Sequence, residues 1–377
     1  MQKRSELKKA KRVVVKIGSS QLCDGEVLSF SRFRALASQV AQIRRRGIEV
    51  VLVSSGAVAA GISKLVLPFK PNTLILKQVC ASAGQVSLMA SWDKALAVFD
   101  LKCAQILLTA EDLADRRRFL NARNTMISLV EMGVVPIVNE NDTVAVEELK
   151  VGDNDTLGSM VASLVEADLF INLTDLDGLY ETDPRLDPQA NLVTEVRQID
   201  ESVLEMAGGG GPLGTGGMIT KLRAASRLAE RGMPSLIANG RTRAILERLI
   251  DGEKLGTFFI PEKENLLKAR KHWLAFAAKP KGTLTVDPGA AAALISRGKS
   301  LLPGGVTQLN GFFDVGDPVT IIGSERMTEI GVGLSNYSAP EVEKIMGHPS
   351  SKIESILGYS RSDEIIHRDN LVIFKHK

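Results

Sequence analysis

Two lysines stand where a positive charge is costly unless an anion lies near it. The first, Lys16, is near the end of the apolar run Val13–Ile17 and is followed by Gly18. Burying an unpaired ammonium group costs free energy, and glycine allows backbone to approach a ligand closely. The pattern indicates either a lysine directed at a phosphate group or an edge-strand lysine that reaches solvent.

The second lysine, Lys221, follows a glycine-rich stretch. Gly208–Gly211 and the run GTGGMITK, which ends at Lys221, lead into a predicted helix. Free backbone N–H groups and the positive end of the helix dipole favour an anion at such a place. Lys221 in the first turn opposes that dipole unless an anion offsets it, and a bound triphosphate would do so.

Acidic and amide side chains gather in two further runs. NEND (139–142) follows a predicted strand, and GDND (152–155) directly precedes a predicted helix. Asp155 is a candidate N-cap, but one cap does not need so many carboxylates and amides. These groups favour a role in binding an ammonium group or in orienting lysines.

Two other strand ends carry weaker signals. Ser54-Ser55-Gly56 follows a strand, and its hydroxyl and N–H groups suit either an anion or a tight turn. The run Leu173–Tyr180 leads from a strand into a polar loop, which is either a wall for a nucleotide base and ribose or an ordinary loop.

Histidine is absent from the first 271 residues. Its absence excludes triad hydrolases and HExxH enzymes from that region. Phosphoryl transfer needs positioning and charge stabilisation more than covalent catalysis. A carboxylate acceptor is already ionised at neutral pH and needs no general base, so these residues favour phosphoryl transfer to a carboxylate.

Alternating strands and helices must position these groups. The six predicted strands are Arg12–Ile17, Glu49–Ser54, Ala104–Thr109, Val134–Asn139, Leu169–Leu173 and Ser235–Ala238. They are short and apolar, as parallel strands covered on both faces are. Helical periodicity fills the gaps, so we expect an α/β fold with a mainly parallel sheet between two helical layers.

The pattern changes near Pro261. Residues 263–278 are predicted to be a linker, and residues 279–377 a small, mostly β domain with one helix near Ala290–Arg297. Residues 1–262 then form the catalytic domain. The tail has 11 Lys and Arg against 11 Asp and Glu, which gives no electrostatic support for RNA binding. Three scattered cysteines and no long apolar run predict a cytoplasmic protein without a membrane span.

Six motifs together resemble the glutamate 5-kinase family of the amino acid kinase superfamily. They occur in the family's order and are VVVKIGSS, VSSGAVAAG, VPIVNENDTV, VGDNDTLGSMVA, LTDLDGLYETDPR and GTGGMITK. The tail sequence KGTLTVDPGAAAALISRGKSLLPGGV resembles the start of a PUA domain. The resemblance implies a three-layer α-β-α sandwich followed by a PUA-like domain.

The resemblance also implies a reaction and a set of roles. The γ-phosphate of ATP passes to the side-chain carboxylate of L-glutamate, which is the first step of proline biosynthesis. Lys16 and Lys221 stabilise the phosphoryl group, and Asp155 holds both lysines. The glutamate-binding residues are Ser55, Asp142, Asn154 and Asp153. The ATP-binding residues are Lys16, Thr174, Asp175, Thr215, Gly216, Gly217, Met218, Ile219, Thr220 and Lys221.

Further expectations come from the same resemblance. They are Mg²⁺ bridging phosphate oxygens, inhibition by proline, a homo-oligomer, and transfer of the acyl phosphate to glutamate 5-semialdehyde dehydrogenase. No protein ligand to the metal is assigned. The alternatives are a related kinase acting on N-acetylglutamate, carbamate or UMP, and an RNA-binding protein that acts through the PUA-like tail.

Overall fold

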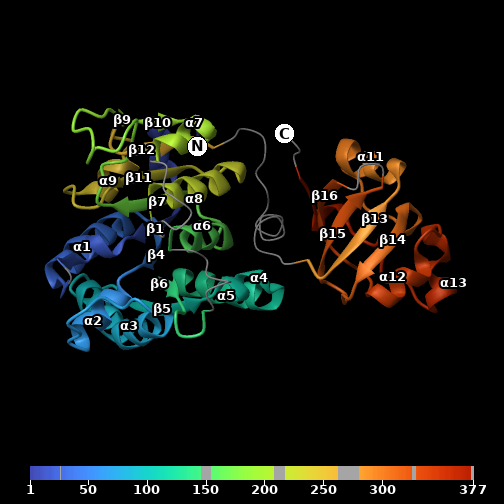
Figure 1. The fold of residues 1–377 in the computed structure, drawn as a ribbon, viewed down its shortest axis with the longest axis horizontal. Coiled ribbons are helices and arrows are strands. Elements are labelled where there is room, and N and C mark those ends of the chain that lie inside the picture. Colours follow the sequence, from blue (N-terminus) through green and yellow to red (C-terminus); the bar gives the residue numbers. More distant parts are fainter. Residues whose placement is uncertain (26, 146–153, 208–216, 262–279, 325–327, 375–377) are drawn as a thin grey trace. The chain divides into compact units, whose positions relative to one another are not determined.

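The computed structural model describes the chain except for residues 26, 146–153, 208–216, 262–279, 325–327 and 375–377. The chain divides into two compact units (Figure 1). Unit 1 consists of Met1–Asp112 and Phe119–Leu266, and unit 2 of Leu113–Arg118 and Leu267–Lys377. None of the helices in the described residues is long and apolar enough to cross a membrane.

Unit 1 is built on an eight-stranded sheet with the order β10-β12-β11-β7-β1-β4-β6-β5. Its strands are β1 (Arg12–Ile17), β4 (Glu49–Ser54), β5 (Cys103–Leu108), β6 (Val135–Glu140), β7 (Leu169–Thr174), β10 (Glu195–Val196), β11 (Ser235–Asn239) and β12 (Thr257–Phe259). All neighbours pair in parallel except β11 and β12. The sheet confirms the mainly parallel architecture expected from the sequence.

Helices cover both faces of this sheet (Figure 1). The helices described before Pro261 are α1 (Phe30–Arg45), α2 (Ala57–Lys64), α3 (Leu74–Ala97), α4 (Ala110–Ala114), α5 (Arg116–Glu131), α6 (Asn154–Leu164), α7 (Glu201–Met206), α8 (Met218–Glu230) and α9 (Ile245–Ile250). Residues of α1, α3 and α9 share one hydrophobic core with β1, whereas α6 and α8 pack together on the other face. The expected three-layer arrangement is therefore present.

Strand β1 divides its side chains between these two faces. Val13, Val15 and Ile17 belong to the core with α1, α3 and α9. Because successive side chains of a strand point to opposite faces, Lys16 is directed toward α6 and α8. Gly158 of α6 permits this close packing, since a Cβ there would come within 3.5 Å of the Lys16 Cβ and 2.9 Å of the Phe170 ring.

Short elements complete unit 1. They are the 3-10 helices η1 (Arg4–Lys9) and η2 (Ser19–Gln21) and the strand pairs β2 (Cys23–Asp24) with β3 (Val27–Leu28) and β8 (Leu179–Tyr180) with β9 (Leu192–Val193). The turn η2 follows β1 directly and so lies at the carboxyl edge of the sheet, where ligands bind in α/β proteins.

Unit 2 contains a separate five-stranded sheet with the order β14-β13-β15-β16-β17. Its strands are β13 (Gly282–Val286), β14 (Val306–Gly311), β15 (Pro318–Gly323), β16 (Thr328–Leu334) and β17 (Leu371–Ile373). Its helices are α11 (Pro288–Arg297), α12 (Ala339–Ile345) and α13 (Ile353–Leu357), with 3-10 turns η4 (Pro303–Gly305), η5 (Ser350–Lys352) and η6 (Arg368–Asn370). The expectation of one helix was wrong, because α12 and α13 are too short to show helical periodicity. The proposed linker, 263–278, lies outside the described residues.

Candidate functional site

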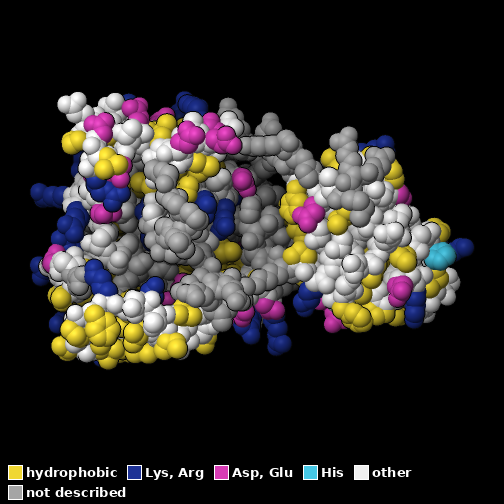
Figure 2. All heavy atoms as spheres, in the orientation of Figure 1, with side chains coloured by type: hydrophobic (Ala, Val, Ile, Leu, Met, Phe, Trp, Pro, Cys, Tyr) yellow, Lys and Arg dark blue, Asp and Glu magenta, His cyan; other side chains and the backbone are white. Residues whose placement is uncertain are grey.

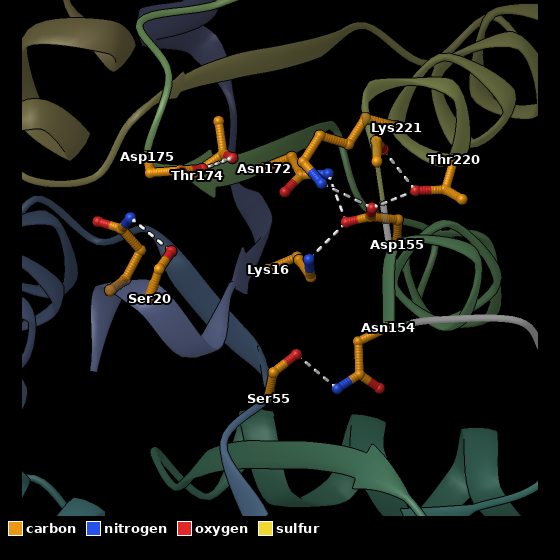
Figure 3. A network of polar contacts seen from close by, with 12 residues as sticks. Lys16, Ser20, Ser55, Asn154, Asp155, Asn172, Thr174, Asp175, Thr220 and Lys221 are labelled. Atoms are coloured by element: carbon orange, nitrogen blue, oxygen red, sulfur yellow. Dashed lines mark hydrogen bonds and ion pairs between the residues drawn. The ribbon is translucent and has the colours of Figure 1, made fainter. Parts of the chain in front are cut away.

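Asp155 is the centre of the site, and its carboxylate joins two lysines that are far apart in the chain. Lys16 Nζ lies 2.5 Å from Asp155 Oδ1, and Lys221 Nζ lies 3.0 Å from Asp155 Oδ2. Lys16 comes from β1, whereas Asp155 and Lys221 come from the first turns of α6 and α8. The structure thus brings the three predicted catalytic residues together (Figure 3).

Two neutral side chains fix the orientation of this carboxylate. Asn172 Nδ2 donates a hydrogen bond to Asp155 Oδ1 at 2.8 Å, and Thr220 Oγ1 donates to Asp155 Oδ2 at 2.8 Å. Each carboxylate oxygen therefore serves one lysine and one neutral donor (Figure 3). We call these five residues the lysine cluster: Lys16, Asp155, Asn172, Thr220 and Lys221.

The charged side chains of the lysine cluster are almost completely buried, which strengthens their electrostatic interactions. The side chains of Lys16, Lys221 and Asp155 are 7%, 8% and 1% exposed. Burial alone would raise the pKa of the Asp155 carboxyl, but the charges of Lys16 and Lys221 outweigh it and hold that pKa below its ordinary value. An ammonium group has three donors, so each lysine can hold Asp155 and still donate to a phosphate oxygen.

A second set of polar side chains begins at the neighbouring residue, Asn154. Its Nδ2 donates to Ser55 Oγ at 2.8 Å and to Asn139 Oδ1 at 2.9 Å, and Asn139 Nδ2 donates to Gln85 Oε1 at 2.9 Å. We call Ser55, Gln85, Asn139 and Asn154 the amide chain. Within the described residues, Asn154 Oδ1 and Gln85 Nε2 are buried without a hydrogen-bond partner.

A cavity of about 600 Å³ adjoins the amide chain. Its lining includes Ser55, Asp142 and Asn154, which are three of the four residues predicted to bind glutamate. Gly56 helps to form the wall, in a turn with φ of 113° that favours glycine. The fourth predicted residue, Asp153, lies outside the described residues. We call this space the Ser55 cavity.

The predicted ATP-binding residues come from two places. Thr174 ends β7 and donates a hydrogen bond from Oγ1 to Asp175 Oδ1 at 3.0 Å. Gly217 is the N-cap of α8, and Met218, Ile219, Thr220 and Lys221 form its first turn. Thr215 and Gly216 lie outside the described residues. The backbone N–H groups at the start of α8 suit a phosphate, and Lys221 brings its charge there.

The described residues contain no group of three or more His, Cys, Asp or Glu side chains arranged to hold a metal ion. Mg²⁺ commonly keeps several waters and binds through one or two carboxylates together with substrate phosphates. A nucleotide at this site would therefore bring most of the oxygen ligands for Mg²⁺.

Three residues of the site were not predicted from the sequence. Asn172 lies on β7 opposite Lys16 of β1 and is 1% exposed. The other residues of β7 are apolar except for the last one, Thr174. A lone amide in an apolar strand was the available signal for it. Asn139 belonged to a recognised motif, whereas Gln85 lies in the long helix α3, where nothing in the local sequence marks it.

Comparisons with known proteins agree with this geometry. The amino acid kinase family model matches residues 11–239, and the PUA domain model matches residues 282–357. Carbamate kinase from Giardia lamblia bound to AMP-PNP has the same fold over 68% of this chain and 100% of its own, with a TM-score of 0.50 and 18% identity. Fold, lysine cluster and family model define a member of the amino acid kinase class.

The relatives narrow this class to one family. Glutamate 5-kinase of Citrifermentans bemidjiense is 51% identical over 97% of this chain and 98% of its own length. Glutamate 5-kinase of Pseudomonas putida strain GB-1 is 50% identical over 98% of this chain and 100% of its own. The chain belongs to the glutamate 5-kinase family.

Proposed function

We propose that this enzyme transfers the γ-phosphoryl group of ATP to the side-chain carboxylate of L-glutamate, giving glutamyl 5-phosphate and ADP. The observation that carries the proposal is the buried carboxylate of Asp155, which holds Lys16 and Lys221 next to the Ser55 cavity. The names and near full-length coverage of the relatives support the same reaction.

In this mechanism the chain provides charge and position. The glutamate side-chain carboxylate has an ordinary pKa of about 4.3 and is ionised at neutral pH, so it attacks the γ-phosphorus without a general base. A new O–P bond forms, and the bond to the leaving ADP oxygen breaks. Lys16 and Lys221 stabilise the negative charge of the transferring group, while Asp155, Asn172 and Thr220 hold the lysines in place.

The Ser55 cavity is proposed to hold glutamate. Asp142 would pair with its ammonium group, and Ser55, Asn154 and Asp153 would bind its polar groups. Asn154 Oδ1 supports this role, since a buried acceptor without a partner favours a ligand that donates to it. Thr174, Asp175 and the stretch Thr215–Lys221 are proposed to hold ATP. Mg²⁺, held mainly by phosphate oxygens, would neutralise part of their charge.

Regulation and cellular setting are also proposed. Proline carries the carboxylate and ammonium groups of an amino acid, so we propose that it inhibits at or near the Ser55 cavity. Glutamate 5-semialdehyde dehydrogenase would consume the labile acyl phosphate. The cysteines Cys23, Cys80 and Cys103 are free, which supports a cytoplasmic location.

We further propose a homo-oligomer and a division of the chain. Exposed apolar residues of α3, among them Ile75, Val79 and Val86 at 71%, 48% and 64% exposure, favour an interface, and hydrophobic side chains gather over α2 and α3 (Figure 2). Residues 1–262 would form the catalytic domain, 263–278 a linker and 279–377 the PUA-like domain.

The reaction is tested by incubating the full chain with ATP, Mg²⁺ and L-glutamate and trapping acyl phosphate with hydroxylamine. We expect hydroxamate that depends on glutamate and decreases when proline is added. Hydroxamate that proline does not affect would contradict the inhibition. Folded protein that forms no hydroxamate would overturn the reaction, and N-acetylglutamate, carbamate and UMP would then be tested as acceptors.

A further inference from the structure

A second cavity, of about 470 Å³, lies on the opposite face of the sheet from the lysine cluster. Its walls come from α1, the turn η2, the segment 240–244 and α9, and none of its lining residues lines the Ser55 cavity. The residues that matter below are Gln21, Arg32, Gln39, Arg241, Arg243 and Glu247. We call it the α1–α9 cavity. Its volume is within the range of about 300–1,000 Å³ typical of small-molecule sites.

One wall of the α1–α9 cavity carries an unsatisfied acceptor. Gln21 is 3% exposed, and its Oε1 is buried without a hydrogen-bond donor among the described residues. The backbone of Gly240 lies against this amide, since a Cβ on Gly240 would come within 2.5 Å of Gln21 Oε1. An unsatisfied buried acceptor destabilises the folded protein. A ligand that donates a hydrogen bond from a hydroxyl group would remove this destabilisation.

The charge of the lining is positive. Arg32, Arg241 and Arg243 face a single lining carboxylate, Glu247. Arg32 Nε is paired with Asp24 Oδ1 at 2.7 Å, whereas Arg241 and Arg243 form no ion pair within the described residues. Guanidinium groups bind phosphate through two parallel hydrogen bonds, which makes arginine the preferred residue for phosphate recognition.

A buried amide adds a fixed donor to this lining. Gln39 is 8% exposed, and its Oε1 accepts a hydrogen bond from the backbone N–H of Leu246 at 3.1 Å. This contact orients the side chain and leaves its Nε2 as a donor at the cavity wall. The lining therefore combines donors suited to an oxyanion with an unsatisfied acceptor, Gln21 Oε1, suited to a hydroxyl group.

We propose that the α1–α9 cavity binds a small phosphate monoester whose remaining part carries hydroxyl groups, such as a sugar phosphate. Arg241 and Arg243 bind the phosphate, and Gln21 accepts a hydrogen bond from a hydroxyl group. A bare anion leaves both the volume and the Gln21 acceptor unused, so inorganic phosphate binds more weakly than the ester.

The same cavity is connected to the Ser55 cavity through η2. Arg241 Nη2 donates a hydrogen bond of 3.3 Å to the backbone oxygen of Ser20, and Ser19 and Ser20 line the Ser55 cavity. A phosphate that draws the Arg241 guanidinium toward itself competes with this contact. Binding in the α1–α9 cavity therefore weakens glutamate binding. This second step rests on the proposed kinase function, whereas ligand binding itself does not.

Binding is tested by calorimetry on the full chain saturated with a non-hydrolysable ATP analogue, which occupies the lysine cluster. Ribose 5-phosphate, inorganic phosphate and ribose are the probes. We expect binding in the order ribose 5-phosphate, then phosphate, then ribose. Arg243→Ala weakens ribose 5-phosphate binding at least tenfold, while Arg34→Ala, an exposed arginine of α1 that does not line the cavity, leaves it unchanged.

A variant of Gln21 separates recognition of the hydroxyl group from attraction of the phosphate by the arginines. Gln21→Leu weakens ribose 5-phosphate binding but leaves inorganic phosphate binding unchanged. The site is overturned if native protein does not bind ribose 5-phosphate, if Arg243→Ala binds it as tightly, or if Arg34→Ala weakens it equally.

The connection between the two cavities is tested separately. Ribose 5-phosphate is expected to raise the KM for glutamate about fivefold to tenfold in native protein, within the usual range of coupling between sites. Arg243→Ala abolishes this effect. Binding without any change in KM overturns the connection and leaves the site standing. Binding to a protein that forms no hydroxamate overturns the kinase function and not the site.

Discussion

The lysine cluster and the amide chain meet at two adjacent residues, Asp155 and Asn154, yet they satisfy their polar atoms differently. Both oxygens of Asp155 are paired with lysines and neutral donors. The unsatisfied atoms of the site within the described residues are all amide atoms, on Asn154, Gln85 and Asn172. An unpaired buried charge costs far more than an unpaired buried amide, and in this site the charged groups are paired while the unsatisfied atoms, which a ligand can pair, are amides.

Asp155→Asn tests the lysine cluster and should have the largest effect. Two buried lysines lose their counter-charge, and the free energy of unfolding at pH 7 should fall by about 3–5 kcal/mol. Denaturant unfolding measures it. Asp251→Asn, which breaks the exposed pair with Arg46, is the control and should cost about 0–1 kcal/mol.

The difference in the free energy of unfolding between native protein and Asp155→Asn should depend on pH, because the pKa of Asp155 is lowered. Its folded pKa lies below the unfolded value of about 3.9, so the contribution of the charged form is complete above that pH. The difference between native protein and Asp155→Asn should stay constant from about pH 7 to 5 and shrink as the pH falls below about 4. A difference that grows on acidification would contradict the assignment.

Lys221→Ala tests whether the lysine cluster stabilises the phosphoryl group during its transfer. Turnover should fall about 10²–10³-fold, because the transferring phosphoryl group loses one of the two positive charges that stabilise it. The KM for glutamate should change little, since the amide chain remains. Lys254→Ala, at an exposed position, is the control. Near-normal turnover in Lys221→Ala would remove the proposed role of this lysine.

Asp142→Ala tests the Ser55 cavity, which adjoins the amide chain. The KM for glutamate should rise about tenfold to a hundredfold, as expected for losing a hydrogen bond to a charged group worth about 1.5–3 kcal/mol. Turnover at saturating glutamate should fall much less than in Lys221→Ala. Steady-state kinetics with varied glutamate separate the two effects, and an unchanged KM would show that Asp142 does not bind glutamate.

Asn172→Leu should have the smallest effect. It removes one of the four donors to Asp155 while keeping a similar shape. Turnover should fall only about threefold to tenfold, because both lysines and Thr220 still hold the carboxylate. Asn172→Asp should be worse, because it places a second carboxylate next to Asp155. If Asn172→Leu raises the KM for glutamate and leaves turnover unchanged, Asn172 belongs with the amide chain.

Much of the fold was predictable because its main strands are long enough to show a pattern. The predicted Arg12–Ile17 and Glu49–Ser54 agree with β1 and β4 at both ends. Strands β10 and β12 were missed, since two or three residues show no periodicity. The antiparallel pairing of β11 with β12 was missed with them.

The site divides in the same way. Local motifs were enough to find Lys16, Asp155 and Lys221, because each has a residue type that is costly at its position unless a partner or ligand is near. They were not enough to find Asn172 or Gln85, whose partners come from other elements.

The sequence by itself determined six of the eight strands of the sheet and which polar side chains stand at their ends. Only the tertiary structure decided which of these groups meet. Lys221 and Asp155 are 66 residues apart, and Asn172 reaches Asp155 because β7 pairs with β1 and α6 covers both. Periodicity and capping act over a few neighbouring residues, whereas these contacts depend on strand order and helix packing across the whole unit.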